Sequence, residues 1–221
     1  MSLRRVAFVS GEYYHLYNRG NSKQKIFLDE ADYNRFLKLL FLCNSELNIN
    51  FRNVIDVAKD PLAFDREETL IDIGAFCLMP NHFHLLVREK EGGNISLFVK
   101  KLLTAYVMYF NKKYERTGSL FEGKFKSEHA GTDNYLKYLF SYIHLNPIKI
   151  IEPKWRIEGI KDKLKAQKYA LNYEYSSYSC LGGESQKWSK ILNTDNFPKY
   201  FLSTRHYKRE IFDWLNSSPR K

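Results

Sequence analysis

Two apolar runs separated by a short turn occupy the middle of the sequence. Residues 70–78 and 82–87 are each rich in large apolar side chains, and Met79-Pro80-Asn81 lies between them. Short apolar runs on either side of a proline-containing turn predict a β-hairpin. We therefore expect a sheet built around this hairpin to be the centre of the fold.

The second run carries two histidines on one face of its predicted strand. Successive side chains of a strand point to opposite faces, so His82 and His84 share one face while Phe83 and Leu85 share the other. At a rise of about 3.3 Å per residue, the two histidine Cα atoms lie roughly 6.6 Å apart, and both imidazoles can reach one cation. The pair is half of a metal site, and a third ligand must come from elsewhere. The alternative is that both histidines are only polar side chains on the wetter face of an amphipathic strand.

The other periodicities predict an α+β fold. The aromatic-rich residues 12–20 predict a first strand, and residues 29–43 and 95–113 show the apolar repeat of helices. A short strand is expected at the end of 118–127, and a third helix over 134–145. The order of these elements matches a ferredoxin-like or RRM-like antiparallel sheet with helices on one face.

The length of 221 residues suits one domain and an extension. We expect a domain over residues 1–150, with an irregular insertion at about 48–69. Residues 151–221 are expected to form a basic C-terminal extension with a final helix near 207–215.

Neither membrane nor disulfide patterns are apparent. No apolar run approaches the roughly 18 residues of a membrane span, and the N-terminus lacks the pattern of a signal peptide. The three cysteines, Cys43, Cys77 and Cys180, are widely spaced, which fits neither a disulfide framework nor a zinc knuckle. We expect no membrane partner, reduced cysteines and a cytoplasmic protein.

The net charge of +10 makes a phosphate-bearing polyanion the first candidate partner. The excess lies in two segments after the histidines. Residues 98–126 hold seven Lys and Arg against two acidic residues, and residues 147–221 hold fifteen against eight. A basic surface that only aids solubility is the alternative.

The predicted third helix offers a reactive side chain. Tyr142 and Asn146 are four residues apart, so they are neighbours on one helical face. A tyrosine hydroxyl can attack a phosphodiester and hold the phosphate as a phosphotyrosine, which allows rejoining without ATP. Because its unperturbed pKa is about 10, it needs activation. A cation bound by His82, His84 and the Asn146 amide oxygen would polarise the phosphate.

Spacing leaves alternatives open on this helix. Tyr142 could be a packing residue, and Asn146 an ordinary helix-end residue before proline. His144 could compete as the ligand. Three other tyrosines could compete as the nucleophile: Tyr106, Tyr109 and Tyr138.

Four motifs occur in order along the chain: YHLYNRG at 14–20, CLMPNHFHLL at 77–86, GSLFEGKFKS at 118–127 and YIHLNP at 142–147. Taken together, they resemble the motifs of the single-tyrosine HUH transposases of the insertion-sequence type. Within that family the chain is most similar to the REP-associated tyrosine transposases. The resemblance spans about residues 12–150, so the expected domain over 1–150 would be the catalytic domain.

The resemblance implies a metal-dependent endonuclease and strand transferase that acts on single-stranded, hairpin-forming DNA through a 5′-phosphotyrosine. By motif, His82 and His84 match the metal ligands, Tyr142 the nucleophile and Asn146 a carboxamide ligand. The implied cofactor is Mg²⁺ or Mn²⁺. Relatives act as monomers or homodimers, and a bacterial-type, nucleoid-associated location is implied. Lys124 occupies a position where many relatives have arginine. A lysine keeps the positive charge but cannot make the bidentate phosphate contact of an arginine.

DNA is expected to lie over basic side chains in the motifs and on the helix over 95–113. These are Arg19, Lys100, Lys101, Lys112, Lys113, Lys124 and Lys126. One rival function is a non-catalytic RRM-like module in which Tyr14, Tyr17 and Phe125 stack bases. A second rival is a metallonuclease that uses activated water and needs no tyrosine.

Overall fold

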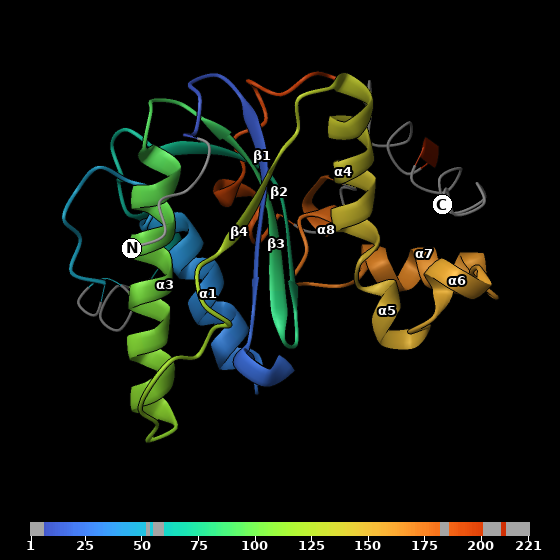
Figure 1. Ribbon diagram of the computed structural model, residues 1–221, viewed down its shortest axis with the longest axis horizontal. Helices are drawn as coiled ribbons and strands as arrows, with labels where there is room; N and C mark the ends of the chain where they lie inside the picture. Colours follow the sequence, from blue (N-terminus) through green and yellow to red (C-terminus); the bar gives the residue numbers. More distant parts are fainter. Residues whose placement is uncertain (1–6, 52–53, 55–59, 182–185, 201–208, 211–221) are drawn as a thin grey trace.

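The computed structural model describes residues 7–51, 54, 60–181, 186–200 and 209–210 (Figure 1). The expected final helix near 207–215 therefore lies outside the described residues, apart from 209–210. Within the described part, no helix is long and apolar enough to cross a membrane. Cys43, Cys77 and Cys180 are free and buried.

A four-stranded antiparallel sheet in the order β2-β3-β1-β4 forms the centre of the fold. Its strands are β1 (Tyr13–Arg19), β2 (Ile71–Met79), β3 (His82–Glu89) and β4 (Lys126–His129). The β2–β3 hairpin is the one expected from the two apolar runs. The α+β class and the ferredoxin-like strand order are confirmed.

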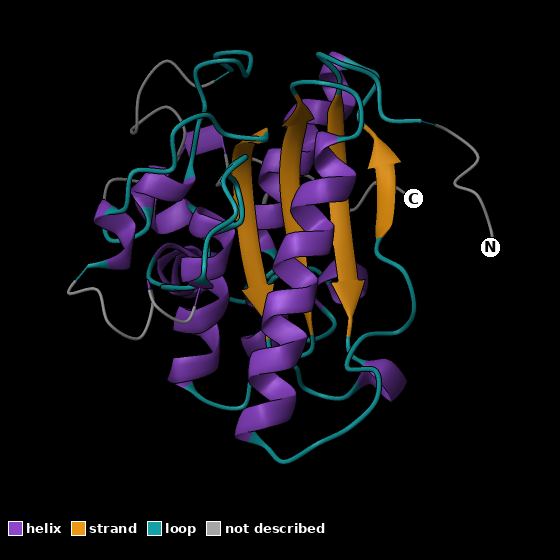
Figure 2. Cartoon of the chain, turned by 90° about the vertical axis from the view of Figure 1, so that its left-hand side faces the viewer, coloured by secondary structure: helices purple, strands orange, loops and turns teal. Residues whose placement is uncertain are grey.

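Two long helices cover one face of the sheet, α1 (Glu30–Leu42) and α3 (Asn94–Lys113). Figure 2 shows the molecule from this side, with a long helix in front of the strands. The start of α1 is defined by a capping box, in which Asp29 accepts from the backbone N–H of Asp32 and the Asp32 carboxylate accepts in return. The buried side chains of both helices pack with Leu16, Phe83 and Leu85 into the larger core.

Helix α4 (Asp133–Leu145) lies on the opposite face, where Figure 1 shows it across the sheet from α1 and α3. The expectation of helices on one face holds for α1 and α3 and is wrong for α4. The reason is visible in β2, which is buried along its whole length. A strand that is apolar on both faces needs a cover on each. Leu136, Leu139 and Ile143 supply the second cover against Ala75 and Leu86.

The described part of the chain after α4 runs through five short elements, of which the first three pack beside the end of α4 and the last two reach the larger core of the sheet. They are α5 (Ile148–Ile151), α6 (Trp155–Glu158), α7 (Lys163–Leu171), α8 (Tyr178–Leu181) and the 3₁₀ turn η3 (Ser189–Ile191). Two further 3₁₀ turns are η1 (Asn21–Lys23) and η2 (Pro61–Ala63), the latter inside the expected insertion at 48–69.

Strand β2 is the edge of the sheet, and the C-terminal segment covers it. The backbone N–H of Leu78 donates to Tyr175 O, and that of Ser177 donates to Phe76 O, both at 2.9 Å. Gly74 makes the contact possible further along, because a Cβ there would lie 2.6 Å from the Phe197 ring. Pairing an edge strand in this way removes an exposed row of backbone groups. A domain boundary at residue 150 stays a prediction.

Acidification should destabilise the metal-free protein through His144. This side chain is fully buried on α4 with its Nε2 2.7 Å from Ser177 Oγ, and burial lowers its pKa to about 3. Below pH 6.5 the unfolded chain binds a proton there that the folded chain does not. The free energy of unfolding should therefore decrease as the pH is lowered from 6.5 to 3, by about 1.4 kcal/mol per pH unit for such a histidine.

Urea unfolding in EDTA at several pH values measures this slope. His144→Gln can still bond to Ser177 but does not titrate, so its slope should be shallower than that of the wild type. Equal slopes would contradict the prediction.

Candidate active site

A pocket of about 330 Å³ opens where β1, β3 and the C-terminal end of α4 meet. His82, His84 and Tyr142 all line it, together with basic side chains from β1, β4 and α5. The antiparallel register of β1 and β3 sets Arg19 opposite His82 and Tyr17 opposite His84. Residues from all four sequence motifs therefore share one cavity.

His82 is held with one ring nitrogen engaged inside the protein. Its Nδ1 lies 2.6 Å from Asn81 Oδ1. An amide oxygen can only accept, so this contact puts the proton on Nδ1 and leaves the Nε2 lone pair for a cation. Burial, followed by the charges of Lys149 and Arg19, lowers the pKa of His82 to about 4. The imidazole is therefore neutral at pH 7, as a metal ligand must be.

His84 is 5% exposed and contacts a third histidine. Its Nδ1 lies 2.9 Å from Nε2 of His15, which projects from β1. The His82 and His84 rings are perpendicular, with centroids 5.0 Å apart. Burial lowers the pKa of His15 to about 4, against the opposing effect of Glu128, so this ring is neutral too.

Tyr142 lies beside the histidines, although it comes from the far helix. Its ring centroid is 5.4 Å from that of His84 and 5.8 Å from that of His15, both in edge-on geometry. Helix α4 places it there because Leu139 and Ile143 turn their side chains into the sheet, while Tyr142 is half-buried at the border of that contact. Tertiary packing thus brings the expected nucleophile next to the expected ligands.

Asn146 is buried at the end of α4 and both sides of its amide are bonded. Its Nδ2 donates to Tyr142 O at 2.8 Å, and its Oδ1 accepts from Lys149 Nζ at 2.8 Å. Lys149 also lies over the Tyr142 ring, 5.8 Å from its centroid. In this conformation the ammonium group of Lys149 is the partner of the Asn146 oxygen.

Several of the competing residues are engaged elsewhere. Tyr106 and Tyr109 both belong to α3, on the opposite face of the sheet from Tyr142. Tyr106 is fully buried and donates to Ile26 O, and Tyr109 donates to Asp32 at 3.0 Å. His144 bonds to Ser177. Tyr138 is different, because it is 37% exposed and stacks on Tyr142 with centroids 5.8 Å apart.

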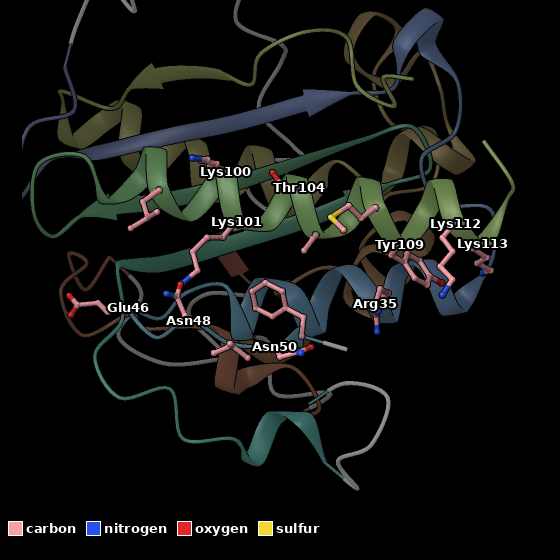
Figure 3. Close-up of a pocket in the computed structure, with 15 residues that line it drawn as sticks. Arg35, Glu46, Asn48, Asn50, Lys100, Lys101, Thr104, Tyr109, Lys112 and Lys113 are labelled. Atoms are coloured by element: carbon pink, nitrogen blue, oxygen red, sulfur yellow. The ribbon is translucent and has the colours of Figure 1, made fainter. Parts of the chain in front are cut away.

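The expected DNA-binding residues divide between the two faces. Arg19 and Lys126 line the pocket, and Arg19 is paired with Glu122. Lys124 is exposed in the loop before β4. The four lysines of α3 instead line a separate groove of about 1040 Å³ between α1 and α3 (Figure 3). The groove is on the opposite face of the sheet from α4, the helix that carries Tyr142.

Two of the four α3 lysines already have partners in the protein. Lys101 Nζ donates to the carbonyls of Ser45 and Leu47, at 2.6 and 2.9 Å. Lys113 pairs with Asp29 and Asp32. Lys100 and Lys112 are exposed.

Sequence reasoning missed Lys149 and His15 as parts of this site. Lys149 follows Asn146 by three residues, a spacing that puts both on one side of a continuing helical turn, so a signal was present. His15 lies inside the first motif, but nothing local shows that it reaches His84 from the neighbouring strand.

The donor set fits a divalent cation as half of a site. Two imidazoles lie side by side, and the bond from His82 Nδ1 to Asn81 orients the other ring nitrogen of His82 for a cation. The described residues contain no cluster of three His, Cys, Asp or Glu that could hold a metal. Further ligands would be the Asn146 oxygen, once Lys149 moves, or phosphate and water.

Comparison with known proteins identifies a family whose model matches this chain. Residues 37–146 match the family model described as "Transposase IS200 like". A solved structure described as "Structure of the REP associates tyrosine transposase bound to a REP hairpin" is similar at 12% identity, with a TM-score of 0.49. That match covers 90% of this chain and 94% of the other. No curated protein sequence matches the chain.

Proposed function

The chain belongs to the IS200-like transposase family of DNA-processing enzymes, and from this we propose that it cuts and transfers single strands of hairpin-forming DNA. Tyr142 would be the nucleophile, and His82 and His84 would hold a divalent cation. The observation that carries the proposal is the approach of the Tyr142 ring to within 5.4 Å of His84 in a pocket lined by basic side chains.

The proposed reaction is a transesterification. The Tyr142 hydroxyl oxygen forms a bond to phosphorus, and the bond from phosphorus to the 3′ oxygen of the preceding nucleotide breaks. The phenol proton passes to water, and the departing oxygen takes one up as a free 3′-hydroxyl. The 5′-phosphotyrosine keeps the bond energy, so that a second 3′-hydroxyl can reverse the step and join a new strand.

A cation, when bound, would neutralise charge on the scissile phosphate and hold it in line with the attacking oxygen. Imidazole donors suit Mn²⁺ better than Mg²⁺, and the ligand set has no carboxylate. We therefore propose a site with low affinity for metal in the absence of DNA. The charge of Lys149 beside Tyr142 would favour a phosphate and an ionised phenol at the same place.

The proposed nucleophile and the two proposed histidine ligands come from one chain. Tyr142 and His84 meet without a contribution from a second copy. We propose that a monomer suffices for the cleavage step.

The fold argues against the rival RRM-like binding module. Such modules stack bases on aromatic side chains of an open sheet face. Here Tyr14 and Phe125 pack on the α1 and α3 side, in the larger core. On the other face, Tyr17 donates its hydroxyl to Glu128 at 2.8 Å, and α4 covers β2 and β3.

The direct test uses DNA hairpins with single-stranded flanks, labelled at the 3′ end. A pool of hairpin sequences is incubated with the protein and Mn²⁺ and run on a denaturing gel. We expect a labelled protein–DNA band that EDTA abolishes. Cleavage without such a band would support the hydrolytic nuclease, and binding without cleavage would support the binding module.

DNA affinity should depend on salt mainly through the pocket lysines. Each phosphate contact to a single strand contributes about 0.7 to the slope of log K against log salt. Lys23→Gln/Lys126→Gln removes two pocket charges, so the slope should fall by about 1.4.

The matched control removes two exposed lysines of the α3 groove, Lys100→Gln/Lys112→Gln. Fluorescence anisotropy at several salt concentrations compares the pairs. A larger loss of slope in the α3 pair would move the DNA path to that face of the sheet.

A further inference from the structure

Three side chains on neighbouring strands form a chain of contacts that ends at the proposed metal site. Glu128 on β4 is directly opposite His15 on β1, and His15 lies diagonally across from His84 on β3. His15 Nε2 is 2.9 Å from His84 Nδ1, and His15 Nδ1 is 3.9 Å from Glu128 Oε2. We propose that His15 and Glu128 are positioning residues that hold His84 in its metal-binding tautomer. This inference rests on the proposed function.

The contact between the two rings permits two proton arrangements. If His84 Nδ1–H donates to His15 Nε2, the lone pair of His84 is on Nε2, and that nitrogen can bind a cation. If His15 donates instead, the proton of neutral His84 is on Nε2, and that nitrogen cannot bind metal. The choice between the two determines whether His84 is a ligand.

Glu128 favours the first arrangement. With His15 Nε2 as the acceptor, the proton of neutral His15 is on Nδ1, the nitrogen that faces the Glu128 carboxylate. Apart from this carboxylate, His15 Nδ1 is buried without a hydrogen-bond partner among the described residues. A negative oxygen beside it stabilises an N–H there and disfavours a lone pair.

The carboxylate itself is fixed from two sides. Glu128 Oε1 accepts from the Tyr17 hydroxyl at 2.8 Å, and Oε2 accepts from the Tyr135 hydroxyl at 2.9 Å. One tyrosine belongs to β1 and the other to α4, so the docking of α4 holds the carboxylate in place. His15 is only 4% exposed, where an apolar side chain would avoid the cost of burying an imidazole. Orienting a metal ligand is the role that accounts for this cost.

The test measures Co²⁺ binding by visible absorption, on a Tyr142→Phe background with hairpin DNA bound. His15→Leu keeps the volume but cannot accept a hydrogen bond, and His15→Gln keeps an amide oxygen as acceptor. We expect His15→Leu to weaken Co²⁺ binding about 10- to 100-fold and His15→Gln to restore most of it. Glu128→Gln, at a half-exposed site that tolerates substitution, should weaken binding up to about 10-fold.

The matched control is His129→Leu, which removes an imidazole that lies beside Tyr14 and bonds to Glu12 outside the pocket. It should leave Co²⁺ affinity unchanged. Wild-type affinity in both His15→Leu and Glu128→Gln would overturn the inference, and so would equal losses in His15→Leu and His15→Gln. If the chain with His15 and Glu128 intact binds no Co²⁺, the inference falls, and adduct formation by the wild type then shows whether the proposed function survives.

Discussion

Tyr142→Phe should abolish the covalent protein–DNA band, with a loss of at least about a thousandfold in the rate of strand cleavage. The substitution removes one oxygen and keeps the ring that stacks on Tyr138 and meets His84. Because this packing is kept, folding and DNA binding should be unchanged. Cleavage should be lost, because the missing oxygen is the atom proposed to bond to phosphorus. The rate is measured as label transferred to protein over time with Mn²⁺.

Tyr138→Phe is the matched control, since Tyr138 undergoes the same chemical change one helical turn away. It should retain the covalent band. Mass spectrometry of the digested adduct should place the nucleotide on the peptide that contains Tyr142. An adduct that persists in Tyr142→Phe and disappears in Tyr138→Phe would transfer the role to Tyr138.

His82→Ala should reduce metal-dependent cleavage about 100- to 1000-fold while hairpin binding stays within about threefold. The side chain is one of two imidazoles proposed to hold the cation, and the proposed ligand set has no carboxylate to replace it. Its ring is only partly buried and its hydrogen bond is to the adjacent Asn81, so the fold should tolerate the change. Cleavage is measured across a Mn²⁺ titration, with anisotropy for binding.

Excess Mn²⁺ should partly restore the variant, because lost affinity can be offset by concentration. The control is His129→Ala, which deletes an exposed imidazole that pairs with Glu12. Wild-type cleavage by His82→Ala at every Mn²⁺ concentration would remove the histidine from the metal site.

The position of Lys149 suggests how the site exchanges partners. Its ammonium bonds to the Asn146 oxygen and lies over Tyr142, where a positive charge is also needed once a phosphate enters. An arriving phosphate offers Lys149 a stronger, charge-assisted partner than an amide. Substrate binding would in this way release the Asn146 oxygen, so that it could bind a cation once the phosphate is in the pocket.

Local patterns were enough to predict most elements of this fold. The hairpin over 71–89 and the helices over 94–113 and 133–145 agree with the expected ranges to within two residues. Alternation and the 3.6-residue repeat report which side chains of one element share a face, and these short-range properties survive folding. The candidate ligands and nucleophile were also readable, because their motifs are contiguous.

Those patterns did not predict which face of the sheet each helix covers. An apolar stripe on α3 and one on α4 look alike in sequence, and only the packing of both against a sheet that is apolar on two sides separates them. This separation places the α3 lysines on the far face, and the basic residues of the pocket are Arg19, Lys23, Lys126 and Lys149.

The contacts that orient the site have the same origin. His15, His84 and Glu128 are distant in the chain and meet through strand order and register. A shift of one residue in either pairing would turn those side chains to the other face. Residue types and their local spacing thus specify the chemistry available to this protein, whereas the long-range packing of β1, β4 and α4 decides which groups come close enough to use it.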